Sequence, residues 1–104
     1  MSRFFRSLDN YAVSNIGDEA VLVPTSSGVA QMSDMLNLNS TAAFILRLLE
    51  EGRSDDDIVA SVLDEYDAPD ADTVREDVDA FISELISRGF FKLITEGDSS
   101  SGNG

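Results

Sequence analysis

The hydrophobic pattern of this chain changes its period at Asn39. Before that residue, β-forming side chains gather in short runs, and after it apolar residues recur every three or four positions. The first helical stripe consists of Ala42, Ile45, Leu46 and Leu49. Asn39 or Ser40 can cap this helix, and Gly52 can end it. The chain is therefore predicted to fold as strands followed by helices.

The segment from residue 10 to residue 36 is predicted to form three strands. They cover residues 11–16, 20–23 and 29–36, with Gly17-Asp18 as the first turn signal and Pro24 as the end of the second strand. The third strand places Ala30, Met32 and Leu36 on one face, and Asp34 interrupts that face.

Three helices are predicted near 40–51, 55–66 and 71–88. Ser54 and Asp57 nearly match a capping box, and Thr73 with Glu76 matches one fully, although Asp70 and Asp72 are alternative caps. The third helix has a firm apolar stripe, which consists of Val74, Val78, Phe81, Ile82 and Leu85. This order indicates an α+β winged helix-turn-helix fold, with a three-stranded antiparallel sheet followed by three helices.

The ends of the chain are predicted to differ from the domain between them. Residues 1–9 form an N-terminal segment, residues 10–94 form the domain, and residues 95–104 lack the apolar side chains that a core needs. Phe90–Ile94 form either a short final strand or a packed extension of the third helix. We expect the tail from residue 95 onward to be disordered.

Composition excludes several classes of function. The chain has no cysteine and no histidine, so it has no disulfide, no thiolate or imidazole metal site and no Cys/His or Ser/His catalysis. We predict no catalytic residue, no metal and no cofactor. A net charge of −13 disfavours nucleic-acid binding, which needs clustered cations. No apolar run approaches the roughly 20 residues of a membrane span, and no signal peptide is evident, so we expect a cytoplasmic protein.

A short segment links the sequence to a known family. Residues 38–46 read L-N-x-T-A-A-x-I-L, which resembles the signature of PqqD-like proteins. The resemblance extends from about Val21 to Leu93. Further matching positions are Gly52, Ile58, Asp77, Val78, Phe81, Leu85, Gly89 and Phe90.

The resemblance implies a function as well as a fold. PqqD-like domains are winged-helix modules that bind the leader of a ribosomally synthesised precursor peptide. They present it to a modifying enzyme, often a radical enzyme, and have no active site of their own. The leader adds as a strand beside the third strand and lies against the third helix. In this chain, the residues expected to contact it are Met32, Asp34, Met35, Leu36, Arg75, Asp79, Ile82 and Ile86.

Two readings of the function stay open. The first is the leader-binding module, for which a free strand edge supplies backbone groups and the acidic helices favour a basic partner. The second is a structural or regulatory winged-helix domain that binds another protein without delivering a peptide. Met32 and Met35 fit a peptide groove and an ordinary core equally well.

Overall fold

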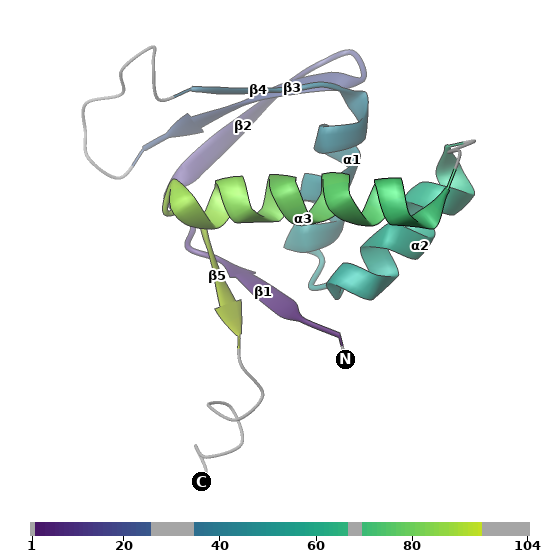
Figure 1. The fold of residues 1–104 in the computed structure, drawn as a ribbon. Helices are drawn as coiled ribbons and strands as arrows, with labels where there is room; N and C mark the ends of the chain where they lie inside the picture. Colours follow the sequence, from purple (N-terminus) through teal and green to yellow (C-terminus); the bar gives the residue numbers. More distant parts are fainter. Residues whose placement is uncertain (1, 26–34, 67–69, 95–104) are drawn as a thin grey trace, which may run out of the picture.

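The computed structural model describes residues 2–25, 35–66 and 70–94, and Figure 1 shows how their elements are arranged. In chain order the elements are β1 (Phe4–Ser7), β2 (Tyr11–Ile16), β3 (Glu19–Pro24), β4 (Leu36–Leu38), α1 (Ser40–Glu50), α2 (Asp55–Glu65), α3 (Ala71–Ser87) and β5 (Phe91–Ile94). The predicted α+β class and the change of period at Asn39 are confirmed. The three helices begin and end close to their predicted bounds.

Strands β2, β3 and β4 form an antiparallel sheet in that order. The β2–β3 hairpin turns through Gly17 and Asp18, with Ile16 opposite Glu19. Gly17 has a φ of 63°, which glycine adopts without the steric penalty of a side chain. A glycine with positive φ at the first of two loop residues is the arrangement of a type II′ turn, which matches the twist of the strands.

The third strand of this sheet is short where it is described. β4 pairs with β3 through Leu36, Asn37 and Leu38, so the strand continues two residues beyond the predicted end at Leu36. The rest of the predicted strand, with Met32 and Asp34, lies outside the described residues. The described part places Leu38 in the core directly before the first helix.

Polar side chains cap the start of each helix. The side chain of Asn39 accepts a hydrogen bond from the Ala42 N–H at 2.9 Å, and Ser54 Oγ accepts one from the Asp57 N–H at 3.1 Å. For α3 the cap is Asp70, whose carboxylate accepts from the Thr73 N–H at 2.7 Å. Of the three caps that the sequence allowed, the structure therefore has Asp70, and Thr73 lies within the first turn of α3.

Two glycines end α1 and α3 in the same way. Gly52 and Gly89 have φ values of 90° and 85°, in the left-handed region. After α1, the Arg53 N–H donates to the Leu48 carbonyl at 3.1 Å, and after α3 the Phe90 N–H donates to the Leu85 carbonyl at 2.9 Å. These are the closing hydrogen bonds of Schellman motifs, which satisfy the last helical carbonyls.

The N-terminal segment is part of the domain. β1 pairs antiparallel with β5, so Phe4 lies opposite Ile94 and Ser7 opposite Phe91. Phe5 is only 4% exposed and belongs to the hydrophobic core. Residues 1–9 were predicted to be a separate segment, because a four-residue strand has too few side chains for a periodic signal. Its partner, the final strand, was one of two options for 90–94.

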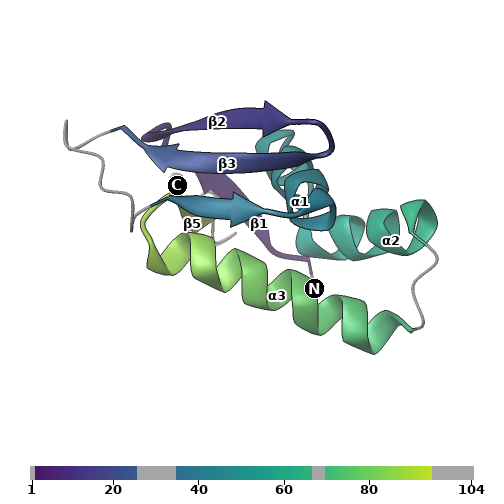
Figure 2. The same cartoon turned by 90° about the horizontal axis from the view of Figure 1, so that it is seen from above.

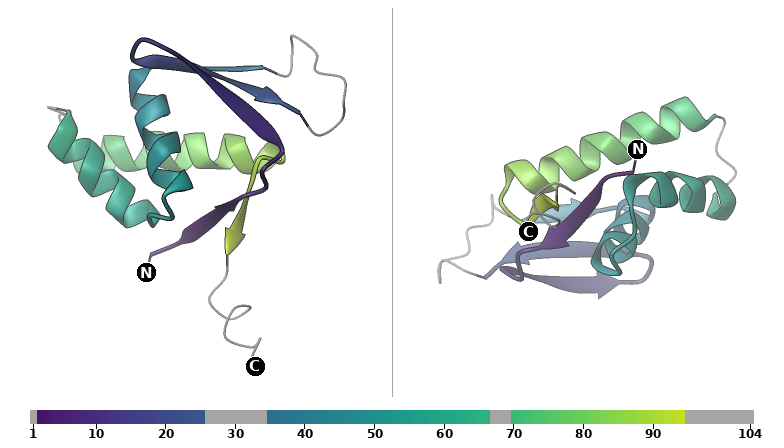
Figure 3. Two further views of the ribbon diagram at one scale, coloured as in Figure 1. Left: turned by 180° about the vertical axis from the view of Figure 1, so that it is seen from behind. Right: turned by 90° about the horizontal axis from the view of Figure 1, so that it is seen from below.

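A single core joins the two sheets and the helices. Its most deeply buried residues come from β3, α2 and α3 and include Leu22, Ile58, Val78 and Leu85, all at 0% exposure. Figure 1 shows α3 crossing the molecule between the β2–β3–β4 sheet and the β1–β5 ribbon, and Figure 2 shows it alongside β4. Figure 3 shows the same layers from behind and from below. The arrangement is compatible with a winged helix.

Candidate functional site

The sheet has two edge strands, β2 and β4, and the outer edge of β4 lies beside α3 (Figure 2). Within the described residues β4 pairs with β3 alone, so its other edge has backbone N–H and C=O groups without a strand partner. Views from above and below both show α3 running along this side of the sheet (Figures 2 and 3). An edge strand with a helix beside it can accept an extended peptide as one more strand.

Met35 and Leu36 lie at the start of this edge. Both side chains are half-buried, and Leu36 packs against the hydrophobic core. They therefore offer apolar surface next to the free backbone groups. Met32 and Asp34, which are predicted to belong to the same site, lie outside the described residues.

Helix α3 has one face in the core. Ile82 is 2% exposed and lies with Val74, Val78 and Leu85 among the buried residues. It packs inside the domain, where a bound peptide could not reach it without rearrangement. Ile86, one turn later, is 38% exposed.

Arg75 and Asp79 belong to a network of ion pairs. The Arg75 guanidinium pairs with Asp55 at 3.2 Å and also with Asp56. Arg3 pairs with Asp79 at 2.9 Å and with Asp55 at 2.7 Å. The network ties the N-terminal segment to α3 and to the start of α2.

Asp55 is at the centre of this network. It is 2% exposed, and its carboxylate also accepts hydrogen bonds from the main-chain N–H groups of Arg3 and Asp56, each at 2.8 Å. Burial by itself would raise the pKa of Asp55, but the hydrogen bonds and charge of Arg3 outweigh burial and hold that pKa below its usual value. The hydrogen bond from Arg75 lowers the pKa of Asp56.

The network shows which side of α3 faces which neighbour. Arg75 and Asp79 face Arg3 and α2, whereas β4 lies on the other side of α3 in Figure 1. Ile86 falls on the side of Arg75, because eleven residues make close to three helical turns. The structure therefore does not bring Arg75, Asp79 and Ile86 together with Met35 and Leu36.

Phe81 lies on the opposite flank of the α3 core stripe. At 3.6 residues per turn it is about 120° away from Arg75, so we infer that it lies on the flank toward β4 (Figure 1). Its ring is half-buried and packs against the core. The apolar stripe of α3 already contained this residue, but the sequence pattern could not show which flank of the stripe faces the sheet edge.

Comparison with known proteins identifies the family. The family model for coenzyme PQQ synthesis protein D, PqqD, matches residues 19–90. The chain belongs to the PqqD family. The matched segment contains the β4 edge, all three helices and the L-N-x-T-A-A-x-I-L segment on which the resemblance rested. No curated protein matches the chain.

Two solved structures resemble this PqqD-family chain over most of its length. One is TbiB1 in complex with the TbiA(beta) leader peptide, with a TM-score of 0.70 and 28% identity, covering 84% of this chain and 94% of that one. The other is lasso peptide synthetase B1 complexed with the leader peptide, with a TM-score of 0.69 and 26% identity, covering 85% of this chain and 96% of that one.

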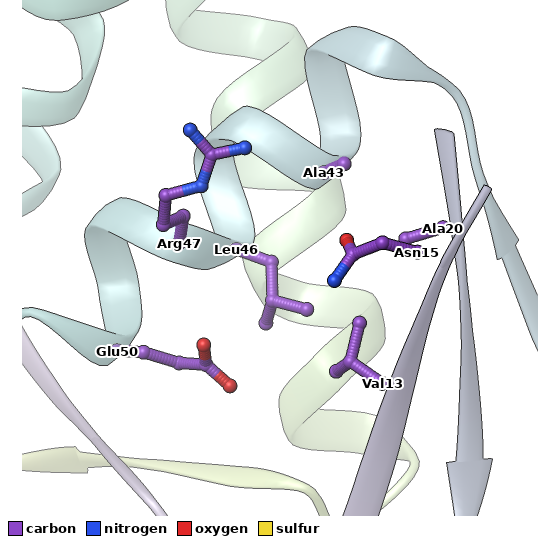
Figure 4. Close-up of a pocket in the computed structure, with 7 residues that line it drawn as sticks. All are labelled: Val13, Asn15, Ala20, Ala43, Leu46, Arg47 and Glu50. Carbon is purple, nitrogen blue, oxygen red and sulfur yellow. The ribbon is translucent and has the colours of Figure 1, made fainter. Parts of the chain in front are cut away.

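One alternative site in this PqqD-family protein is a hollow between α1 and the β2–β3 hairpin (Figure 4). It is lined by Val13, Asn15, Ala20, Ala43, Leu46, Arg47 and Glu50. Its volume of about 160 Å³ is below the roughly 300–1,000 Å³ of typical small-molecule sites. Neither β4 nor α3 lines it, so it is separate from the candidate edge.

Within residues 2–25, 35–66 and 70–94, no group of three or more acidic side chains is arranged to hold a metal ion. No helix in those ranges is long and apolar enough to cross a membrane. The absence of a cofactor stays a prediction from composition.

Proposed function

We propose that this chain binds the leader of a ribosomally synthesised precursor peptide and presents it to a modifying enzyme. The observation that supports this most strongly is the likeness to two proteins solved with leader peptides, over 94% and 96% of their chains. Membership of the PqqD family agrees with it. The chain acts as a recognition partner, and the chemistry belongs to the enzyme, for which a radical enzyme is one candidate.

The leader binds as an added strand on the outer edge of β4. Main-chain hydrogen bonds between an extended peptide and an open strand edge give affinity whatever the peptide sequence. Selectivity comes from side chains that point into the space between strand and helix. Because strand side chains alternate, every second leader residue faces α3.

The apolar contacts of the leader are proposed to be Met35 and Leu36 from the sheet and Phe81 from α3. Met32 and Asp34, which precede them in the chain, complete the proposed edge. Arg75 and Asp79 are left out, because their side chains hold Arg3 and the start of α2. Ile82 supports the site from the core, and Ile86 lies on the flank away from β4.

The test is a titration of the isotope-labelled protein with the leader peptide, followed by amide chemical shifts. We expect the largest shifts at residues 35–38 and around Phe81, with small shifts at Arg75 and Asp79. Shifts that cluster at the hollow near Arg47 would place the peptide elsewhere. If no shift occurs at any concentration of leader, the structural or regulatory reading replaces the leader-binding one.

A further inference from the structure

The β1–β5 ribbon has an exposed face that the leader site does not use. Residues that lie directly opposite in an antiparallel pair share a face, and adjacent pairs alternate between faces. Phe5 and Phe91 are buried, so their pairs form the inner face. The outer face therefore consists of two cross-strand pairs, Phe4 with Ile94 and Arg6 with Lys92.

This outer face is basic and apolar on a strongly acidic protein. Phe4 is 47% and Ile94 is 37% exposed. The sequence has 7 Lys and Arg against 20 Asp and Glu. Four of those cations make ion pairs within the described residues, namely Arg3, Arg53, Arg75 and Arg88. Arg6 and Lys92 make none there, although they lie directly opposite each other.

Two like charges directly opposite in a sheet destabilise the pairing. A partner with carboxylates facing Arg6 and Lys92 would remove that repulsion. An apolar side chain between those carboxylates would cover Phe4 and Ile94. The ribbon thus suits a partner whose surface is acidic around an apolar centre.

The ribbon is also placed so that it can act together with the leader site. β1 and β5 lie outside the segment that the family model matches, residues 19–90. In Figures 1 and 3 the ribbon projects on the side of α3 away from the β2–β3–β4 sheet. A protein bound there would leave the outer edge of β4 free for a peptide.

We propose that the outer face of the β1–β5 ribbon docks an acidic surface of the modifying enzyme while the leader occupies β4. The identity of the partner rests on the proposed function, since presentation requires one surface for the peptide and another for the enzyme. A second copy of this chain is a poor occupant, because copies with a net charge of −13 repel each other.

The test measures association with the purified modifying enzyme encoded beside this gene, at low salt. Lys92→Glu and Arg6→Glu should each slow association by about tenfold, because charges at an interface act mainly on the association rate. Arg47→Glu is the matched control, since it makes the same change of charge at an exposed position on α1. We expect it to slow association by less than about threefold. Equal effects of all three variants would overturn the proposal.

Two further measurements exclude simpler explanations. Lys92→Glu replaces the repulsion with an attraction to Arg6, so its melting temperature should stay level or rise while docking weakens. A lowered melting temperature that accounts for the weaker docking would count against the proposal. Sedimentation that shows a dimer broken by Lys92→Glu would assign the face to a second copy instead.

The acidic residues after β5 provide the last control. If Glu96→Gln with Asp98→Asn abolishes the effect of Lys92→Glu on association, the tail of this chain is the occupant and the proposal fails. Leader affinity is measured on the same samples and should change less than about twofold. If the wild-type protein binds no leader, the proposed function is contradicted. If leader binding is intact but the charge changes at Arg6 and Lys92 do not affect association with the enzyme, only the proposal for the ribbon is contradicted.

Discussion

The role of Asp55 in the structure differs from the role that its position in the sequence suggests. In the sequence it is the first of three consecutive aspartates at the start of a helix, where the helix dipole favours anions. In the structure it is buried, while Asp57 two positions later is exposed. The difference arises because Arg3 and Arg75 reach Asp55 from distant parts of the chain.

We predict that Asp55→Asn destabilises the domain by about 1.5–3 kcal/mol, the range for hydrogen bonds to charged groups. The amide keeps the shape of the side chain but loses the charge that holds both arginines. Asp57→Asn is the control, because it removes the same charge from the same helical turn at an exposed position, and it should change stability by less than about 0.5 kcal/mol. Denaturant unfolding measures both. Equal losses would show that Asp55 acts only through the helix dipole.

The pH dependence of stability follows from the lowered pKa of Asp55. Its folded pKa lies below the value of about 3.9 in an unfolded chain, so the folded state favours the carboxylate. The stability that Asp55 contributes is complete above pH 3.9 or so and is lost as pH falls through the folded pKa. The difference in unfolding free energy between wild type and Asp55→Asn should therefore become smaller from pH 6 to about pH 2. A difference in unfolding free energy that does not change with pH would contradict the ion pairs of Asp55 with Arg3 and Arg75.

Among the elements, β1 offers a test of where the domain begins. Phe4 and Phe5 are adjacent but point to opposite faces, with 47% and 4% exposure. Phe5→Ala should cost about 3–5 kcal/mol, as for other buried aromatic residues. Phe4→Ala should cost less than about 1 kcal/mol, because exposed positions tolerate substitution. Thermal or denaturant unfolding compares the pair, and similar small losses would place β1 outside the folded unit.

The β4 edge is tested through its backbone. Met35→Pro removes one N–H next to the strand, while Met35→Leu keeps the N–H and a similar apolar volume. If that N–H bonds the leader, the proline variant should bind about 2- to 12-fold more weakly, which corresponds to one hydrogen bond. The leucine variant should bind like wild type. Calorimetry with the leader peptide measures both, and equal affinities would move the peptide away from this position.

The whole molecule has an uneven distribution of charge. Its net charge is −13, yet the outer face of the ribbon has two unpaired cations in the described structure. Helices α2 and α3 contain ten of the 20 acidic residues, so we expect a leader with basic residues. Raising salt from about 20 mM to about 500 mM should slow leader association by about tenfold or more, with a smaller change in dissociation. Stopped-flow fluorescence measures the association and dissociation rates separately. If the association rate does not depend on salt, the acidic side chains contribute to solubility and not to leader binding.

The sequence by itself determined the helices, the hairpin and the family. Apolar stripes, capping side chains and terminal glycines are local features, because a helix satisfies its backbone within a few residues of the chain. The same holds for Gly17 at the β2–β3 turn. The L-N-x-T-A-A-x-I-L segment was specific enough for the family to follow, and the proposed function followed from the family.

Only the tertiary structure decided which side of α3 faces the open edge of β4. Spacing placed Arg75, Asp79 and Ile86 on one flank and Phe81 on the other, but periodicity is the same whichever flank meets the sheet. The orientation of α3 is marked by Arg3, which pairs with Asp79 at 2.9 Å although the two residues are more than 70 positions apart in the chain. The pairing of β1 with β5 likewise joins the two ends of the domain. Contacts between distant segments produce no periodic pattern in the sequence, because each contact forms only when the rest of the fold places the two residues next to each other.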